Sequence, residues 1–265
     1  MKVSAIVPAA GRGKRFGGKQ NKVFERLKGR PIFIRSLELF ANREDVCQIL
    51  LVVHPEDRAM VAEKFGGNLG LMGVTIVEGG DERSDSVRNA LAQVAEQADF
   101  IAVHDAARPC VSPLWIDEVF AAAQECGAAI LACPVHGTLK KVSSADIKPD
   151  SPLTILGEPV AVAAKRQYRI EQTAERMAGL WEAQTPQVFA KELLREAYAR
   201  WGDRAATDDA QLVEALGRPV AVVPGDVRNV KITTAGDLNL AAAVVDTLPR
   251  PKPKTDGSPF AEAQW

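Results

Sequence analysis

Short apolar segments alternate along the chain with segments whose apolar residues recur at helical spacing. The apolar runs predict six strands, at residues 3–7, 48–53, 74–77, 100–103, 129–134 and 220–223. Helical periodicity predicts seven helices, at residues 31–42, 56–65, 84–98, 113–126, 191–200, 208–216 and 235–245. This alternation predicts an α/β fold, a Rossmann-like and mostly parallel sheet with helices on both faces.

Residues 135–181 interrupt this alternation. Two strand-like runs, residues 138–142 and 160–164, flank a stretch rich in Ser, Asp and Pro. We therefore expect one domain over residues 1–246, from which residues 136–178 protrude as a β-arm. Exposed strands need a partner or a cover, so the arm is the expected homodimerisation element. Residues 247–265 lack apolar periodicity, which predicts a disordered tail.

Composition and charge exclude several classes of protein. The 265 residues are 46% hydrophobic and 25% charged, and the formal net charge is −1, which argues against nucleic acid as a partner. Apolar runs stay below the ~18 residues of a membrane span, and the chain begins with a strand rather than a signal peptide. The four cysteines have neither zinc-site nor C-x-x-C spacing. We expect a cytoplasmic enzyme with reduced thiols.

Positive charge is concentrated after the first strand. Between Gly11 and Arg30 there are eight Lys or Arg residues and one acid, Glu25. Ligands of parallel sheets bind beyond the carboxyl ends of the strands, and glycines let backbone N–H groups approach an anion. The segment is neither a P-loop, because Arg15 follows Gly13-Lys14, nor a dinucleotide fingerprint, because Phe16 occupies the third glycine position. A polyphosphate is the expected ligand, with a solvated basic loop as the alternative.

Seven motifs occur in a fixed order along the chain. They are Pro8-Ala-Ala-Gly-Arg-Gly-Lys-Arg15, Gly79-Gly-Asp-Glu-Arg-Ser-Asp-Ser-Val87, His104-Asp-Ala-Ala-Arg-Pro109, Pro134-Val with Thr138 and Lys140, Trp181-Glu-Ala-Gln-Thr-Pro-Gln187, Thr207-Asp208, and Asn229-Val-Lys-Ile-Thr233. With them the chain, from residue 3 to about residue 243, resembles the 2-C-methyl-D-erythritol 4-phosphate cytidylyltransferase family of the non-mevalonate isoprenoid pathway. The resemblance implies a nucleotide-diphospho-sugar transferase fold. It also implies cytidylyl transfer from CTP to 2-C-methyl-D-erythritol 4-phosphate, giving 4-diphosphocytidyl-2-C-methyl-D-erythritol and pyrophosphate.

The resemblance further implies roles for individual residues. The matching catalytic positions are Arg15, Lys22, Arg176 and Lys231. The CTP-binding positions are Ala9, Ala10, Gly11, Gly13, Gly80, Asp81 and Ser86. The substrate-binding positions are Asp105, Arg108, Thr138, Thr185 and Thr207, and Asp105 is also the expected ligand of a Mg²⁺ cofactor. In a dimer, Thr138 and Arg176 would reach the neighbouring subunit's site from the arm.

Some features depart from the family pattern or have a second interpretation. Asn21 and Val23 replace the usual neighbours of Lys22, and Lys19 is a possible substitute for that lysine; Gly137 replaces an acid, and the arm is longer than usual. Ser84 is the expected N-cap of the helix at residues 84–98. His104 is expected to pack or orient rather than bind metal, because a hard cation prefers oxygen.

Other functions remain open at this point. Ribitol-5-phosphate cytidylyltransferase would share the nucleotide motifs and differ in the polyol pocket. A catalytically inactive CTP-binding regulator would keep the fold without turnover, although the expected catalytic residues are present. A nucleotide-sugar glycosyltransferase would share the architecture, but the chain lacks the D-x-D metal motif of that class.

Overall fold

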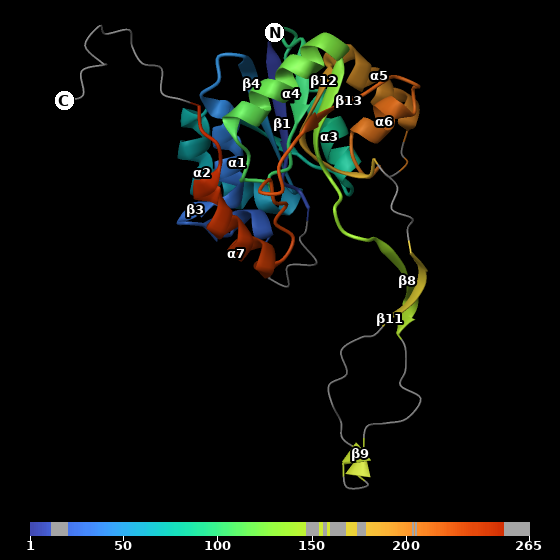
Figure 1. Ribbon diagram of the computed structural model, residues 1–265. Helices are drawn as coiled ribbons and strands as arrows, with labels where there is room; N and C mark the ends of the chain where they lie inside the picture. The colour runs from blue at the N-terminus through green and yellow to red at the C-terminus, as the bar shows by residue number, and fades with distance from the viewer. Residues whose placement is uncertain are drawn as a thin grey trace, which may run out of the picture. The chain divides into compact units, whose positions relative to one another are not determined.

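The structure is a computed structural model that describes residues 1–11, 21–146, 154–155, 158–159, 168–173, 179–202, 204 and 206–251. In this part of the chain seven strands form one sheet in the order β13-β7-β12-β6-β1-β4-β5 (Figure 1). The strands are β1 (Val3–Pro8), β4 (Val46–Val53), β5 (Val74–Glu78), β6 (Phe100–Val103), β7 (Ala128–Pro134), β12 (Trp181–Ala190) and β13 (Ala221–Pro224). β1 pairs in parallel with β4 and β6, β4 with β5, and β7 with β13, whereas β12 runs antiparallel to β6. The predicted mostly parallel sheet is confirmed.

All six predicted strands are present, with ends within two residues of the expected positions. β12 is the strand of this sheet that the sequence pattern missed. Its buried positions include Gln184, Thr185 and Gln187, so apolar side chains do not mark its inward faces. These polar groups are satisfied by hydrogen bonds inside the protein, which periodicity cannot reveal.

The predicted helices are also present; the one at residues 113–126 has the predicted ends, and the ends of the other six differ from the prediction. The helices are α1 (Ile32–Ala41), α2 (Pro55–Leu71), α3 (Arg83–Leu91), α4 (Pro113–Cys126), α5 (Lys191–Trp201), α6 (Ala210–Glu214) and α7 (Ala235–Val244). α3 ends at Leu91, and turns follow it. The sequence predicted an end at residue 98 because Val94 and Ala98, which are also buried, continue the apolar pattern beyond the helix. The expected N-cap was wrong: Glu82 caps α3 in a capping box with Asp85, and Ser84 is buried within the first turn.

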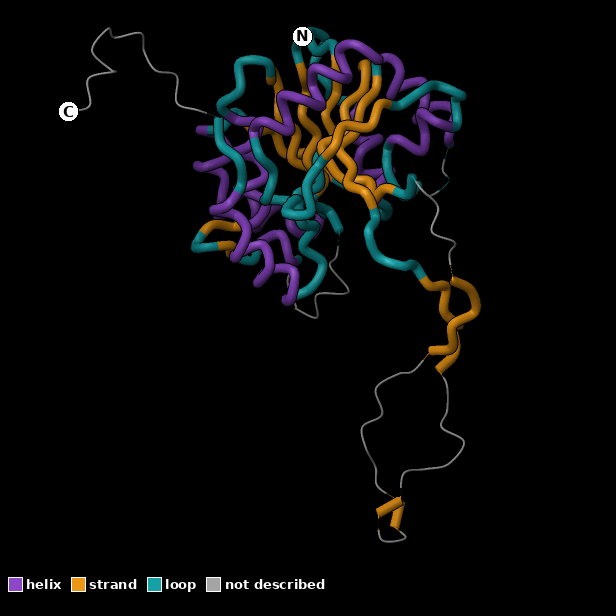
Figure 2. Tube along the Cα trace, viewed as in Figure 1, coloured by secondary structure: helices purple, strands orange, loops and turns teal. Residues whose placement is uncertain are grey.

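Two apolar clusters cover the two faces of the sheet. Val3, Ala5 and Val7 of β1 point to the face covered by α1, α2 and α4, and Ile6 points to the face covered by α3, α5 and α6. β4 alternates in the same way, which is the period of two expected for strands buried on both sides. Figure 2 shows the helices in purple around these orange strands.

Short elements complete the main unit. They are the 3₁₀ helices η1 (Lys22–Phe24) and η2 (Val245–Thr247) and the two-stranded pair β2 (Arg26–Leu27) and β3 (Arg30–Pro31). A third cluster packs α7 against Leu27, Ile32 and Ile232. Leu248 packs against this cluster and the Ser112 hydroxyl donates to the Pro249 carbonyl, so contacts extend beyond the predicted boundary at residue 246.

Residues 134–182 form a second compact unit. β8 (Lys140–Asp146) pairs antiparallel with β11 (Tyr168–Thr173), and β9 (Thr154–Ile155) pairs with β10 (Glu158–Pro159). The predicted strand at residues 138–142 overlaps β8, and the one at residues 160–164 lies outside the described residues. Across both units, no described helix combines the length and the apolar character of a membrane span.

Candidate active site

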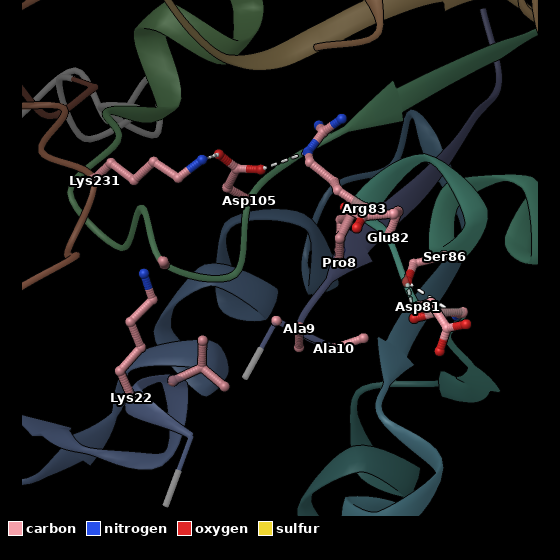
Figure 3. Close-up of a pocket in the computed structure, with 14 residues that line it drawn as sticks. Pro8, Ala9, Ala10, Lys22, Asp81, Glu82, Arg83, Ser86, Asp105 and Lys231 are labelled. Carbon is pink, nitrogen blue, oxygen red and sulfur yellow. Dashed lines mark hydrogen bonds and ion pairs between the residues drawn. The ribbon is translucent and has the colours of Figure 1, made fainter. Parts of the chain in front are cut away.

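A cavity of about 280 Å³ lies at the carboxyl ends of β1, β5 and β6 (Figure 3). Its lining comes from the segment after β1, from η1, from the β5–α3 turn, from the loop after β6 and from Lys231. The lining residues are Pro8, Ala9, Ala10, Gly11, Lys22, Val23, Gly80, Asp81, Glu82, Arg83, Ser86, Asp105, Ala107 and Lys231. Residues expected to bind nucleotide thus lie together although they are far apart in sequence.

The segment after β1 forms one wall of the cavity. The Ala9 amide donates to the Val52 carbonyl at 2.7 Å, which continues the β1–β4 ladder by one residue. Ala9 and Ala10 are buried, so only small side chains separate this backbone from the cavity. Gly13, Arg15 and Lys19 lie outside the described residues.

Lys22 is presented by a short helix that is tied to this wall. The Asn21 side chain donates to the Ala9 carbonyl at 2.7 Å and accepts from the Val23 amide at 3.3 Å. Phe24 packs edge-on against Phe33 with ring centroids 5.5 Å apart. Figure 3 shows the Lys22 side chain extending from η1 toward the loop after β6. Asn21 and Val23, which depart from the family pattern, therefore have a local structural role in placing Lys22.

The β5–α3 turn requires glycine because side chains crowd it. A Cβ at Gly80 would lie 2.4 Å from the Asp85 Cβ, and a Cβ at Gly79 would lie 2.6 Å from the Ala10 Cβ. The Gly80 amide donates to the Ser86 hydroxyl at 3.1 Å. Asp81 is exposed at the rim of the cavity. The turn thus brings backbone and hydroxyl groups close to the cavity.

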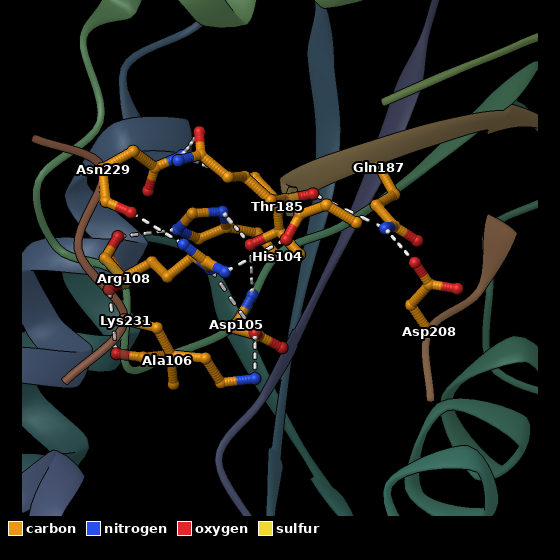
Figure 4. A network of polar contacts seen from close by, with 12 residues as sticks. His104, Asp105, Ala106, Arg108, Thr185, Gln187, Asp208, Asn229 and Lys231 are labelled. Carbon is orange, nitrogen blue, oxygen red and sulfur yellow. Dashed lines mark hydrogen bonds and ion pairs between the residues drawn. The ribbon is translucent and has the colours of Figure 1, made fainter. Parts of the chain in front are cut away.

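Asp105 is a buried carboxylate among three cations, of which Figure 4 shows Arg108 and Lys231 and Figure 3 shows Arg83. Its Oδ2 lies 2.7 Å from Lys231 Nζ and 3.8 Å from Arg108 Nε, and its Oδ1 lies 3.3 Å from Arg83 Nε. Burial alone would raise the pKa of Asp105, but Arg83, Lys231 and Arg108 outweigh it and hold that pKa far below its usual value. The carboxylate is therefore ionised throughout the physiological range.

His104 packs behind Asp105, as expected from the sequence. Its Nδ1 lies 3.1 Å from the Thr185 hydroxyl, which also accepts from the Asp105 amide, and its Nε2 lies 3.0 Å from the Arg108 carbonyl. Since a carbonyl only accepts, Nε2 carries the proton and Nδ1 accepts from Thr185. Burial lowers the pKa of His104 to about 4, so the ring is neutral at pH 7.

A second cavity, of about 190 Å³, lies beside the first. Its lining residues are Arg83, Asp105, Arg108, Ala183, Gln184, Thr185, Gln187, Thr207, Asp208 and Lys231. The expected substrate-binding residues Arg108, Thr185 and Thr207 are brought together here. Arg83, Asp105 and Lys231 line both cavities, so these three side chains mark the junction between them.

The donor set at Asp105 limits what metal it could hold. Among the described residues no group of three or more His, Cys, Asp or Glu side chains could enclose a metal ion. Asp105 offers hard oxygen donors of the kind that Mg²⁺ prefers, but Lys231 and Arg83 already contact them. The site fits Mg²⁺ as one carboxylate ligand that needs further oxygens from a bound phosphate or water.

Not every predicted residue falls in these cavities. Thr138 is exposed in the unit formed by residues 134–182, and Arg176 lies outside the described residues. Arg83 was missed although it belongs to the second motif, because a cation in a first helical turn is usually a solvated residue. No local pattern indicated that Asp209 contacts Arg83, since 126 positions separate them.

Comparisons with known proteins agree with one another. The family model IspD, described as 2-C-methyl-D-erythritol 4-phosphate cytidylyltransferase, matches residues 3–247. A curated protein of that name from Rhodopirellula baltica is 40% identical over 255 residues, covering 92% of this chain and 95% of that protein. Another from Geobacillus thermodenitrificans is 38% identical over 247 residues, covering 92% and 97%. The crystal structure of the Thermus thermophilus protein of the same name has a TM-score of 0.68 at 35% identity and covers 93% and 100%.

Proposed function

The chain belongs to the 2-C-methyl-D-erythritol 4-phosphate cytidylyltransferase family, and on that premise we propose how its residues divide the work of the reaction. It is a nucleotidyltransferase of isoprenoid biosynthesis, which transfers the cytidylyl group of CTP to 2-C-methyl-D-erythritol 4-phosphate. The products are 4-diphosphocytidyl-2-C-methyl-D-erythritol and pyrophosphate.

The meeting of two cavities at Arg83, Asp105 and Lys231 is the observation that supports the division of the site. CTP binds in the first cavity, and the sugar-alcohol phosphate binds in the second. A phosphate oxygen of the acceptor forms a bond to the α-phosphorus of CTP, and the bond to the bridging oxygen of the β-phosphate breaks. Pyrophosphate leaves with that electron pair. Holding both reactants at one junction makes the attack effectively intramolecular.

The cations stabilise the charge that develops during transfer. Lys22 approaches the first cavity from η1, and Lys231 lies at the junction. Negative charge builds on the nonbridging oxygens and on the leaving pyrophosphate, so fixed ammonium groups lower the barrier. Arg15 takes the same role by family resemblance, from a segment outside the described residues.

The β5–α3 turn and the wall after β1 bind the nucleotide. Gly80 and Ser86 bring a backbone amide and a hydroxyl to the cavity, and Asp81 lies at its rim. These groups suit the polar edges of a pyrimidine and the ribose. Ala9, Ala10 and Gly11 leave room for the triphosphate to approach the main chain.

Asp105 is the proposed protein ligand of Mg²⁺. Bound there with the phosphates, the ion would neutralise charge on the triphosphate. Asp105 is ionised and fixed by Thr185, Arg83 and Lys231, so its carboxylate is already oriented toward the junction.

The unit formed by residues 134–182 is the proposed dimerisation arm of a cytoplasmic homodimer. Leu139, Val142 and Ile170 are between 46% and 57% exposed, and Val142 lies opposite Ile170 on the ribbon formed by β8 and β11. A second copy of the chain would cover them. Thr138 and Arg176 would then contact the acceptor phosphate of the partner's site.

Pyrophosphate release by the purified protein tests the proposal. With CTP and Mg²⁺, 2-C-methyl-D-erythritol 4-phosphate should support turnover, and addition of EDTA should abolish it. Faster release with ribitol 5-phosphate would contradict the acceptor assignment. Tight CTP binding without release for either acceptor would instead favour an inactive CTP-binding regulator.

A further inference from the structure

A fully buried carboxylate lies behind the junction of the two cavities. Asp209 is the N-cap residue of α6. Its Oδ1 accepts a hydrogen bond from the Tyr198 hydroxyl at 2.5 Å, and its Oδ2 lies 2.7 Å from Arg83 Nη2. A buried charge is tolerated only when it is paired and hydrogen-bonded, and both oxygens of Asp209 meet that condition.

The main chain of Asp209 is held as well. Gln187 of β12 accepts from the backbone amides of Asp209 and Ala210, each at 3.1 Å. The Gln187 amide group also donates to Asp208 Oδ2 at 3.1 Å. Contacts from β12, α5 and α3 therefore hold Asp209 in place.

Arg83 connects this carboxylate to the candidate active site. Its Nη2 contacts Asp209, and its Nε lies 3.3 Å from Asp105 Oδ1. The same side chain lines both cavities. Because a guanidinium is planar and rigid, fixing Nη2 against Asp209 also fixes the direction of Nε.

Resting on the proposed role of Asp105, we propose that Asp209, supported by the Tyr198 hydroxyl, is a positioning residue for the transfer reaction. It holds the Arg83 guanidinium against Asp105 and thereby fixes the Asp105 carboxylate at the junction. If Arg83 served only to hold α3 against α6, its ion pair with Asp209 would be sufficient. The second contact of the same guanidinium, with Asp105, extends the network to the reacting groups.

A double-mutant cycle tests this inference by pyrophosphate release. Asp209→Asn keeps the side-chain shape and removes the charge, and Arg83→Gln removes the guanidinium. Asp209→Asn should lower kcat about 10- to 100-fold, with the KM for CTP within about threefold of the parent, and Arg83→Gln should lower kcat at least as much. Since Asp209 acts through Arg83, the double variant should be no slower than Arg83→Gln alone. A parental kcat in Asp209→Asn, or losses that multiply in the double variant, would overturn the inference.

If Asp209→Asn does not fold, a variant with a smaller structural change tests the positioning role of Asp209. Tyr198→Phe removes only the hydroxyl that supports Asp209 and should lower kcat about fivefold at unchanged KM for CTP. Ser112→Ala is the matched control, because it removes another buried hydroxyl from the start of α4, outside both cavities. Equal kcat values in these two variants would contradict the proposed role.

Asp105→Asn separates this inference from the proposed function. Parental turnover in Asp105→Asn would contradict the role of Asp105 itself. Loss of turnover in Asp105→Asn together with a parental kcat in Asp209→Asn would overturn the positioning role of Asp209 alone.

Discussion

The five charged residues that contact one another at and behind the cavity junction include one more cation than carboxylate. The carboxylates Asp105 and Asp209 face three cations, Lys231, Arg83 and Arg108. Low-dielectric walls strengthen the field of these cations at an anion that enters the junction. A phosphate that carries developing negative charge is the ligand best matched to this arrangement.

Replacing Lys22 tests the contribution of the cation from η1. Lys22→Ala should lower kcat by about 10²- to 10³-fold, because a preorganised charge near the α-phosphate is lost. Lys28→Ala is the matched control, since Lys28 follows in the same segment and pairs with Asp246 at the surface. Similar steady-state rates of pyrophosphate release in the two variants would show that Lys22 is misassigned.

The close contacts of Gly80 predict a binding defect. In Gly80→Ala the new Cβ meets the Asp85 Cβ at 2.4 Å, so the β5–α3 turn must shift and displace the Ser86 hydroxyl. The KM for CTP should rise by about tenfold or more. Gly66→Ala in α2, where the new Cβ would meet no described atom within 4 Å apart from its chain neighbours and the nearby backbone of its own helix, should leave this KM unchanged. The assignment fails if both variants bind CTP equally well.

His104 couples folding to pH. Its pKa is about 4 in the folded protein, because of burial, against an ordinary value of 6.5. Between these values the unfolded chain binds a proton that the folded chain does not, so stability is full above pH 6.5 and falls toward pH 4. The loss should be on the order of 3 kcal/mol.

Urea denaturation of metal-free protein at several pH values measures this linkage. Between pH 6.5 and pH 4 the free energy of unfolding should fall more steeply for the parent than for His104→Gln, which has no imidazole to protonate. Identical slopes for the two proteins would rule out His104 as the cause.

At the residue scale, the structure brings three of the expected site residues to one cavity. Asp105 and Lys231 come from the ordered motifs, and Lys22 comes from the basic segment after the first strand. Asp209 was missed because its role depends on a contact with Arg83 across 126 positions, and because an acid before a helix resembles an ordinary cap.

At the scale of elements, β12 shows why apolar pattern alone was insufficient. The strand lies between β7 and β6, yet it presents Gln184, Thr185 and Gln187 to the interior. The Thr185 hydroxyl accepts a hydrogen bond from the Asp105 amide, and the Gln187 side chain accepts one from the Asp209 amide. These three residues of β12 line the second cavity, and because they are polar, β12 lacks the apolar pattern from which strands are predicted.

The arm offers a prediction at this scale. Val142 and Ile170 are opposite each other on β8 and β11, and both are exposed. Val142→Asp should convert the proposed homodimer into monomers, because a charge in the proposed apolar interface would be desolvated without a partner. Sedimentation equilibrium measures the change, and kcat/KM for the acceptor should fall with it.

Leu71→Asp in α2 is the matched control, since Leu71 is 92% exposed in the other unit. It should remain dimeric. A dimeric Val142→Asp protein would contradict the proposed arm interface.

At the scale of the whole molecule, the sheet explains why the site is where it is. β1, β4, β5 and β6 are parallel, so the segments that follow them meet at one edge. The alternation of short apolar runs with helical segments made this arrangement predictable from the sequence. The contacts that join the two cavities depend on side-chain geometry, so they could not be predicted from the sequence.

A crystal structure with Mg²⁺ and a non-hydrolysable CTP analogue tests the central claim most directly. We expect the α-phosphate at the junction, within contact distance of Lys22 or Lys231, and the cytosine beside Gly80 and Ser86. Density for the nucleotide that places the α-phosphate away from Arg83, Asp105 and Lys231 would contradict the claim.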